Sequence, residues 1–89
     1  MPNINAQIGQ STSAIVKNEF VDDSAYATVQ EIFKSTGSVH EIAEKDFSTF
    51  AAIAGSSPAF IYMFIDAMAR AGVLHGIPKD QATAIVAET

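Results

Sequence analysis

The feature that most constrains this chain is an apolar stretch between two helix-boundary signals near its carboxyl end. Ser57 is suited to cap a helix start, and Pro58 suits the first helical position, where its missing amide hydrogen costs nothing. Gly76, or alternatively Gly72, can end the helix in a left-handed conformation. The sequence therefore predicts a long helix over residues 58–75.

The first half of this predicted helix, residues 59–65, is apolar on every side. A helix of that kind is covered on most of its faces rather than half exposed. Asp66 and Arg70 interrupt the apolar run before it reaches the roughly 18 residues of a membrane span, so we expect no membrane insertion. These two side chains lie four positions apart and are placed to pair on the one polar strip.

Upstream of this helix, the pattern predicts a strand, a helix and a second strand. Residues 1–10 read as an extended start that runs into a loop, and the β-prone run 11–17 follows. Residues 38–43 are the second strand candidate. Two strands alone are marginally stable in water, so we expect this α/β unit to belong to a larger sheet.

The helix between the two strands has clear boundary residues. Asp22 and Asp23 are candidates for its N-cap, and Gly37 is its expected stop. Apolar positions recur with helical spacing, which predicts one buried stripe made of Ala25, Val29, Ile32, Phe33 and Thr36.

A change of character at residues 44–46 predicts a boundary between a domain of residues 1–44 and a domain of residues 45–89. Beyond it the pattern contains helices only: a short one that ends at Gly55, the long one, and a last one from about Pro78. The chain stops within the apolar stripe of the last helix, so we expect it to be an internal piece of a longer protein. The predicted fold class is α+β and mostly helical.

Composition excludes several function classes. The net charge of −5, with five Lys and Arg in all, argues against nucleic acid as a partner. No cysteine is present, so a disulfide framework and a thiolate zinc site are excluded, and the carboxylates suggest no metal site. The first residues have neither a basic region nor an apolar core, so no secretory signal is expected and the cytoplasm is the expected location.

The turn at residues 55–59 carries the strongest candidate for chemistry. It superficially matches the Gly-x-Ser-x-Gly nucleophile elbow of serine hydrolases, with His40 and His75 as possible bases, but that elbow needs a strand before the serine. Here a helix precedes it, Pro58 follows, and Ala59 replaces the second glycine. The plain interpretation is a helix–turn–helix with a serine cap, and the functional one is that free amides at the helix start face a ligand.

This region resembles pyrroline-5-carboxylate reductases, which read Ser-Gly-Ser-Gly-Pro-Ala-Tyr, an apolar helix, Ala-Gly-Val, Gly-Leu-Pro and a further helix. The matching residues are Gly55, Ser56, Pro58, Ala59, Ala71, Gly72, Val73, Gly76 and Pro78. The chain departs from that pattern at Ala54, Ser57, Phe60 and Ile77. Upstream, Met1-Pro2-Asn3 resembles the Met-Pro-Asn that ends a strand of the family's dinucleotide-binding domain. The resemblance covers the whole chain but only the middle of the enzyme.

The resemblance implies both a fold and an activity. The fold would be the last strands of a Rossmann-like domain followed by helices of a 6-phosphogluconate-dehydrogenase-like helical domain. The activity would be the last step of proline biosynthesis, in which 1-pyrroline-5-carboxylate is reduced to L-proline with NADPH or NADH. The family's dimers intertwine their helical domains, which implies a homodimer or larger homo-oligomer through the helix 58–75.

The resemblance also implies where the ligands lie. The turn at Ser56 would lie near the nicotinamide and the imine, and Pro2 and Asn3 would face the cofactor from the end of a strand. Asn5 stands where the family usually has proline, so it does not carry over. The chain has no Gly-x-Gly-x-x-Gly, and the family's carboxylate-binding Ser-x-Pro-Gly-Gly-Thr-Thr would lie beyond Thr89. The cofactor would therefore be bound mainly outside this chain, the chain alone is expected to be inactive, and the proton donor is unassigned.

Two alternatives come from other classes. A non-catalytic helical dimerisation module, complete in itself, would also explain the apolar helix. A serine hydrolase is the other alternative, and an active-site serine probe would test it.

Overall fold

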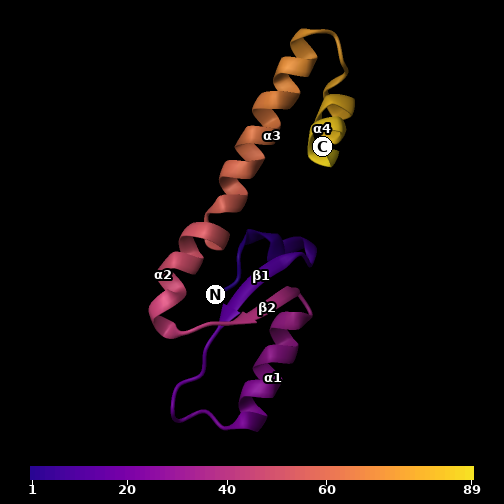
Figure 1. The fold of residues 1–89 in the computed structure, drawn as a ribbon. Coiled ribbons are helices and arrows are strands. Elements are labelled where there is room, and N and C mark those ends of the chain that lie inside the picture. Colours follow the sequence, from indigo (N-terminus) through magenta and orange to yellow (C-terminus); the bar gives the residue numbers. More distant parts are fainter. The chain divides into compact units, whose positions relative to one another are not determined.

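The computed structural model describes all 89 residues and shows a mostly helical α+β chain with two parallel strands followed by helices (Figure 1). The residues form two compact units, Met1–Pro58 and Ala59–Thr89, which are described separately below. In chain order the elements are the 3₁₀ helix Ile4–Ile8, β1 (Ser11–Ile15), α1 (Asp23–Lys34), β2 (Gly37–Glu41), the 3₁₀ turn Glu44–Asp46, α2 (Phe47–Phe50), the π turn Ala51–Gly55, α3 (Ser57–Leu74) and α4 (Lys79–Glu88).

The first unit is built around β1. Its two parallel strands pair in register from Ser11 with Gly37 to Ile15 with Glu41, which confirms the predicted α/β unit. On the other edge of β1, the backbones of Met1 and Ala14 exchange two hydrogen bonds of 2.6 and 2.9 Å, the pattern of an antiparallel pair. Because β1 has neighbours on both edges, it is the most buried element, with every residue buried except Thr12.

The expected extended start is wrong beyond Asn3. The chain forms the 3₁₀ helix Ile4–Ile8 and leaves it through Gly9, whose φ of +70° is a left-handed conformation. Met1 runs antiparallel to β1, so the chain has to reverse direction before β1 begins. The tight 3₁₀ turn and the glycine make that reversal in a few residues.

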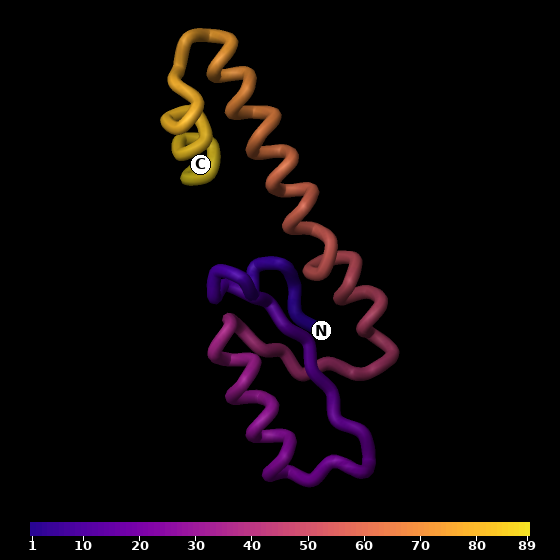
Figure 2. The backbone as a smooth tube through the Cα atoms, turned by 180° about the vertical axis from the view of Figure 1, so that it is seen from behind, coloured from indigo at the N-terminus to yellow at the C-terminus, as the bar shows by residue number.

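Helix α1 connects the two strands, as Figure 2 shows along the backbone. Its predicted cap is confirmed: the Asp22 carboxylate accepts a hydrogen bond from the Ala25 amide at 2.7 Å. The predicted buried stripe is only partly present, because no residue of α1 is buried and Ile32 is 60% exposed. Tyr26 and Phe33 are half-buried, and two strands are too narrow to cover the rest of the stripe.

Gly37 does not end α1 in a left-handed conformation, contrary to the prediction. Ser35 caps the helix in a right-handed conformation, and Gly37 is the first residue of β2 with φ of +149°. A Cβ atom at Gly37 would lie 2.0 Å from the Ser11 carbonyl oxygen. The glycine is therefore required by the close approach of the two strands, not by the helix end.

Helix α2 and the π turn pack against the strand pair from the side opposite α1. Thr12 and His40, whose side chains alternate with those that face α1, line a hollow of about 300 Å³ together with Phe50 and Ala54. Phe50 is 8% exposed and anchors this contact. The first unit is thus a helix, a strand pair and a helical segment in three layers.

In the second unit, α3 and α4 form a helical hairpin (Figure 2). Gly76 ends α3 as predicted: its φ is +95°, and the amides of Gly76 and Ile77 bond to the carbonyls of Val73 and Gly72. This is the Schellman pattern of helix ends. A Cβ at Gly72 would lie 3.3 Å from the Ala82 Cβ, so small residues set how closely the two helices approach.

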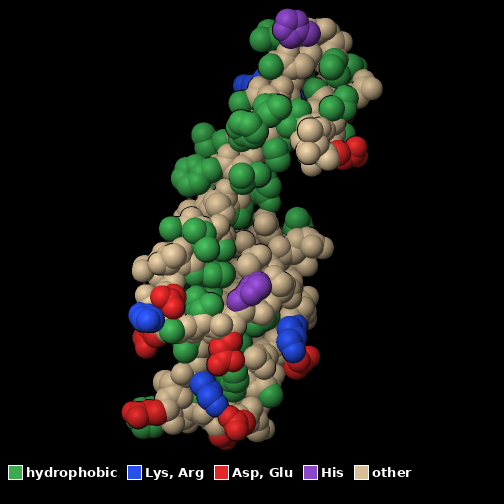
Figure 3. Space-filling view, viewed as in Figure 1, with side chains coloured by type: hydrophobic (Ala, Val, Ile, Leu, Met, Phe, Trp, Pro, Cys, Tyr) green, Lys and Arg blue, Asp and Glu red, His purple; other side chains and the backbone are tan.

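The surface of α3 is rich in exposed apolar side chains (Figure 3). Its predicted polar pair is confirmed by a 2.6 Å contact between Arg70 and Asp66. The large apolar side chains of α3 that are at least 48% exposed in this single chain are Phe60, Ile61, Tyr62, Met63, Phe64 and Leu74. By length and composition the helical run Glu44–Leu74 could cross a membrane, a test that core helices of soluble proteins also pass. Asp66 and Arg70 therefore do not exclude insertion by themselves, contrary to the expectation.

The close approach at Gly37 yields the first prediction. Replacement of Gly37 by Ala should lower the free energy of unfolding by at least about 3 kcal/mol, because the new Cβ overlaps the Ser11 backbone and forces the strands apart. The control is Gly9→Ala, which also places Ala at positive φ but meets no atom within 4 Å, and should cost about 1–2 kcal/mol. Urea unfolding followed by circular dichroism measures both, and equal losses would contradict the steric argument.

Candidate functional site at the π turn

The long apolar helix does not begin afresh at Ser57, contrary to the prediction. The backbone is already helical through α2 and the π turn, and Ser56 between the turn and α3 keeps right-handed angles of −98° and −25°. The Ser56 amide donates to the Ala51 carbonyl at 3.0 Å, five residues back. Because the helical run continues through this turn, the turn is not a helix N-terminus, and the row of free amides that we predicted there is absent.

Pro58 explains why the helix widens here. Inside a helical run, a proline lacks the amide that would bond to the carbonyl four residues back, and its ring collides with that carbonyl. A π turn relieves such a collision by adding a residue to the turn. The carbonyls that cannot receive an amide from position 58 are those of Ala54 in an α register and Ile53 in a π register.

Both of these carbonyls accept a hydrogen bond from a side chain. The Ser57 hydroxyl donates to the Ile53 carbonyl at 2.6 Å, so Ser57 is not the N-cap that the sequence predicted. The Asn3 side-chain amide donates to the Ala54 carbonyl at 3.0 Å, across 51 residues of sequence. The widened turn is thus supported by one local and one distant donor.

Asn3 also contacts the beginning of β1. Its side-chain oxygen accepts a hydrogen bond from the Thr12 backbone amide at 3.3 Å, and its backbone amide donates to the Ser11 hydroxyl at 3.4 Å. That hydroxyl is buried and shares a 3.1 Å hydrogen bond with Ser13. Asn3 therefore joins the amino-terminal segment, β1 and the π turn through polar contacts that are partly shielded from water.

The three residues predicted to face the cofactor have different surroundings. Ser56 and Pro2 are exposed, whereas Asn3 is half-buried, with its side-chain oxygen and nitrogen both hydrogen-bonded within the chain. The structure brings Asn3 to the turn that precedes Ser56, and Pro2 is the residue before Asn3. Gly55 has no structural need to be glycine, because a Cβ there would meet only the Ala51 Cβ at an ordinary 3.8 Å.

Neither histidine makes a hydrogen bond to Ser56. His40 lines the 300 Å³ hollow beside the strands, whereas His75 is exposed just after α3. Ser56 follows a π turn instead of a strand, so the nucleophile-elbow geometry is absent. No three metal-binding side chains of the His, Cys, Asp and Glu types gather anywhere in the chain.

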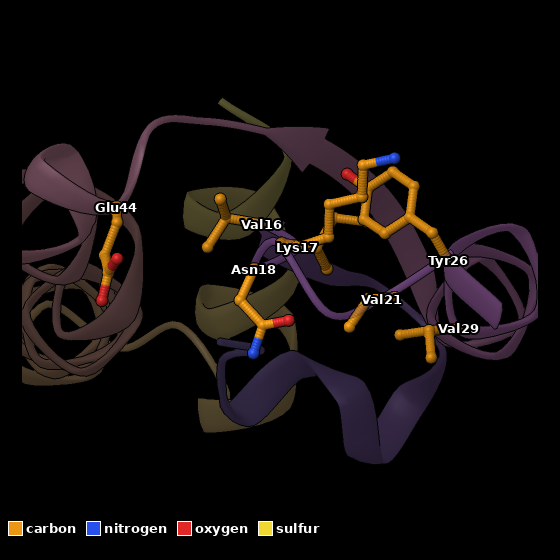
Figure 4. A pocket seen from close by; sticks show the side chains of 8 residues that line it. Val16, Lys17, Asn18, Val21, Tyr26, Val29 and Glu44 are labelled. Carbon is orange, nitrogen blue, oxygen red and sulfur yellow. The ribbon is translucent and has the colours of Figure 1, made fainter. Parts of the chain in front are cut away.

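A second hollow, of about 340 Å³, lies at the carboxyl end of β1 and was not found from the sequence (Figure 4). Lys17 lies over the Tyr26 ring, 5.4 Å from its centre, and contacts Asp23 at 2.5 Å. The Lys17 hydrogen bond lowers the pKa of Asp23, and that bond raises the pKa of Lys17. The Tyr26 hydroxyl is buried, and desolvation, with the nearby Glu41 carboxylate, raises its pKa.

The residues around the π turn and α3 match a known family. The family model described as pyrroline-5-carboxylate reductase dimerisation matches residues 44–89. The chain belongs to the pyrroline-5-carboxylate reductase family. The matched region includes the π turn and the apolar face of α3, which is exposed in the single chain.

Relatives and solved structures agree with this assignment. The pyrroline-5-carboxylate reductase of Aquifex aeolicus is 40% identical over the whole chain, and that of Escherichia coli is 38% identical over 99% of it. The chain covers 34% and 33% of these two proteins, so it spans about a third of their length.

Two solved structures extend the match to the fold. The 1-pyrroline-5-carboxylate reductase of Streptococcus pyogenes superposes on 99% of the chain with a TM-score of 0.91 at 53% identity. The Plasmodium falciparum pyrroline carboxylate reductase, solved with NADP bound, gives the same coverage and TM-score at 34% identity. The chain covers 34% and 36% of those two chains. Two parallel strands followed by helices therefore match the fold of these reductase structures.

The role of Ser57 gives the second prediction. Ser57→Ala should cost less than about 1 kcal/mol, because the exposed Ile53 carbonyl can bond to water once the hydroxyl is gone. Asp22→Ala is the matched control, since Asp22 is a true helix cap and its loss should cost about 1–2 kcal/mol. Unfolding midpoints decide the order, and a larger loss at Ser57 would restore the cap interpretation.

Proposed function

We propose that this chain is part of an enzyme that reduces 1-pyrroline-5-carboxylate to L-proline with NADPH or NADH. The observation that carries the proposal is the match of 99% of the chain to reductase structures at 53% and 34% identity. The cofactor would supply the hydride, and the protein would supply binding and orientation. The chain has no Gly-x-Gly-x-x-Gly, so residues outside it would hold most of the cofactor and the isolated chain would be inactive.

Within this enzyme, we propose that Ser56, Pro2 and Asn3 form the edge of the cofactor site. Ser56 is exposed on a turn that is fixed by two side-chain donors. The neighbouring Gly55 needs no glycine for its own packing, which suits a backbone approached closely by a ligand. Asn3 lies beside this turn, with Pro2 before it, so the three residues would meet one ligand from two segments of the chain.

We further propose a homodimer or larger homo-oligomer, formed through the helix 58–75, in the cytoplasm. The apolar side chains of α3 are exposed in the single chain, and soluble proteins rarely leave such a contiguous face uncovered. The family model for this region is described as a dimerisation region, which supports the same surface. The net charge of −5 supports neither nucleic acid nor an acidic membrane as the partner.

The proposed role of Ser56 is tested by Ser56→Val in the complete enzyme. Loss of the hydroxyl and the added bulk should raise the Michaelis constant for NADPH about tenfold, the usual effect of one hydrogen bond lost to a ligand. Stability should change little, because Ser56 is exposed. The matched control is Ser48→Val, the same change at an exposed position of α2. Unchanged kinetics in Ser56→Val would remove Ser56 from the site.

The proposed assembly surface is tested by Phe64→Glu. Phe64 is 64% exposed on α3, and a charge buried there without a partner should shift the protein from oligomer to monomer. Phe20→Glu is the control, because Phe20 is 85% exposed in the loop before α1 and lies outside the proposed surface. Sedimentation velocity measures both variants, and a parent protein that sediments as a well-folded monomer would contradict the assembly.

The alternative is a stand-alone, non-catalytic dimerisation module, which the description of the matching family region also favours. It predicts the same sedimentation behaviour but no effect of this sequence on NADPH binding. Kinetics of the complete enzyme with the Ser56→Val variant therefore separate the two functions.

A further inference from the structure

The Ala54 carbonyl is where the proline, the widened turn and the amino-terminal segment meet. Pro58 cannot supply an amide to it, and Asn3 donates its side-chain amide to it at 3.0 Å. The contact is partly buried and joins two segments 51 residues apart. This hydrogen bond links the segment Met1–Asn3 to the helical run that precedes Ser56.

The other end of the Asn3 side chain is fixed as well. Its oxygen accepts from the Thr12 amide at 3.3 Å, so the amide group cannot rotate without losing both contacts. Thr12 lies in β1, the most buried element of the unit, which gives the side chain a rigid base. The Asn3 side chain thus links the Ala54 carbonyl to β1 by a hydrogen bond at each of its two polar atoms.

We propose that Asn3 is a positioning residue: its side-chain amide holds the Ala54 carbonyl left without a proline amide, and so fixes the π turn that places Gly55 and Ser56. The Ser56 amide donates to the Ala51 carbonyl at 3.0 Å across this turn, so the hydrogen-exchange rate of that amide measures how stable the turn is. That Ser56 meets the cofactor rests on the proposed function, but the claim that Asn3 holds the π turn in place is independent of it.

Asn3→Asp tests the proposal because it removes the contact to Ala54 and keeps the contact to Thr12. The aspartate oxygen still accepts from the Thr12 amide, but the ionised carboxylate has no hydrogen to donate to the Ala54 carbonyl. Hydrogen exchange of the Ser56 amide should accelerate about five- to tenfold, the range expected for the loss of one hydrogen bond. Exchange in α1, which belongs to the same unit as Asn3 and Ser56, should stay at the parent rate, which shows that this unit is still folded.

Two comparisons make this test specific. Asn18→Asp is the matched control: only its side-chain oxygen bonds, to the Phe20 amide at 3.0 Å, so the same charge change should leave Ser56 exchange unaltered. Lowering the pH from about 8 to about 4 protonates part of the new carboxyl, because an aspartic acid side chain in water has a pKa of about 3.9. The protonated group can donate again, so Ser56 exchange should return toward that of the parent at the same pH.

A double variant covers the case in which Asn3→Asp loosens the whole unit. Adding Pro58→Ala supplies an amide four residues after Ala54, which can replace the lost donor and should restore protection of the Ser56 amide. Unaltered Ser56 exchange in Asn3→Asp would overturn the proposal, and so would loosening that neither low pH nor Pro58→Ala reverses.

Kinetics of the complete enzyme separate this proposal from the proposed function. If the turn places Ser56 at the cofactor, Asn3→Asp should raise the Michaelis constant for NADPH more than it lowers kcat, with recovery at lower pH. Faster exchange with an unchanged Michaelis constant would leave Asn3 as the residue that fixes the turn and would refute the cofactor site at Ser56.

Discussion

The missing amide of Pro58 is the constraint on which the centre of this structure depends. A proline inside a helical run forces a choice between breaking the helix and widening it, and the chain widens. The proline leaves the Ile53 and Ala54 carbonyls without an amide from position 58, and Ser57 and Asn3 donate hydrogen bonds to them. A partly buried carbonyl without a donor is costly, so the Asn3 contact to Ala54 is part of how the helical run tolerates the proline, while the exposed Ile53 carbonyl can also bond to water.

The strand pair gives this arrangement its rigid base. β1 is paired on both edges, by β2 and by Met1, and its close contact with β2 is possible only because Gly37 carries no side chain. α1 covers one face, while α2 and the π turn cover the other. The turn before Ser56, the residue proposed to meet the cofactor, is therefore linked to the most buried strand through the Asn3 side chain.

Features set by local sequence were predictable. Asp22 caps α1, Gly76 ends α3, the pair of Asp66 and Arg70 forms, and both strands lie where β-prone runs were seen. Each of these depends on residues within about one helical turn or on simple alternation. The family resemblance, read from short motifs around the long helix, was also correct.

Features set by distant contacts were not predictable. Gly37 was interpreted as a helix stop because the approach of Ser11, 26 positions earlier, leaves no local signal. Ser57 was interpreted as a cap and Pro58 as a first helical residue because serine followed by proline usually marks a helix start. The helical run that enters this turn from α2, and the Asn3 contact 51 residues away, reverse that interpretation. The hollow beside Lys17 and Tyr26 likewise needs the folded arrangement of α1 and β1 to exist.

The contact between α3 and α4 has a consequence for how this sequence can change over time. Gly72 of α3 faces Ala82 of α4, and the small side chains of Ala69 and Ala82 are buried, whereas the bulky residues 60–64 of α3 are exposed. The hairpin and the outward apolar face are thus encoded at separate positions. Substitutions among the large side chains can therefore retune which surface α3 recognises while the hairpin keeps its spacing, whereas a single added methyl group at Gly72 would alter the hairpin itself.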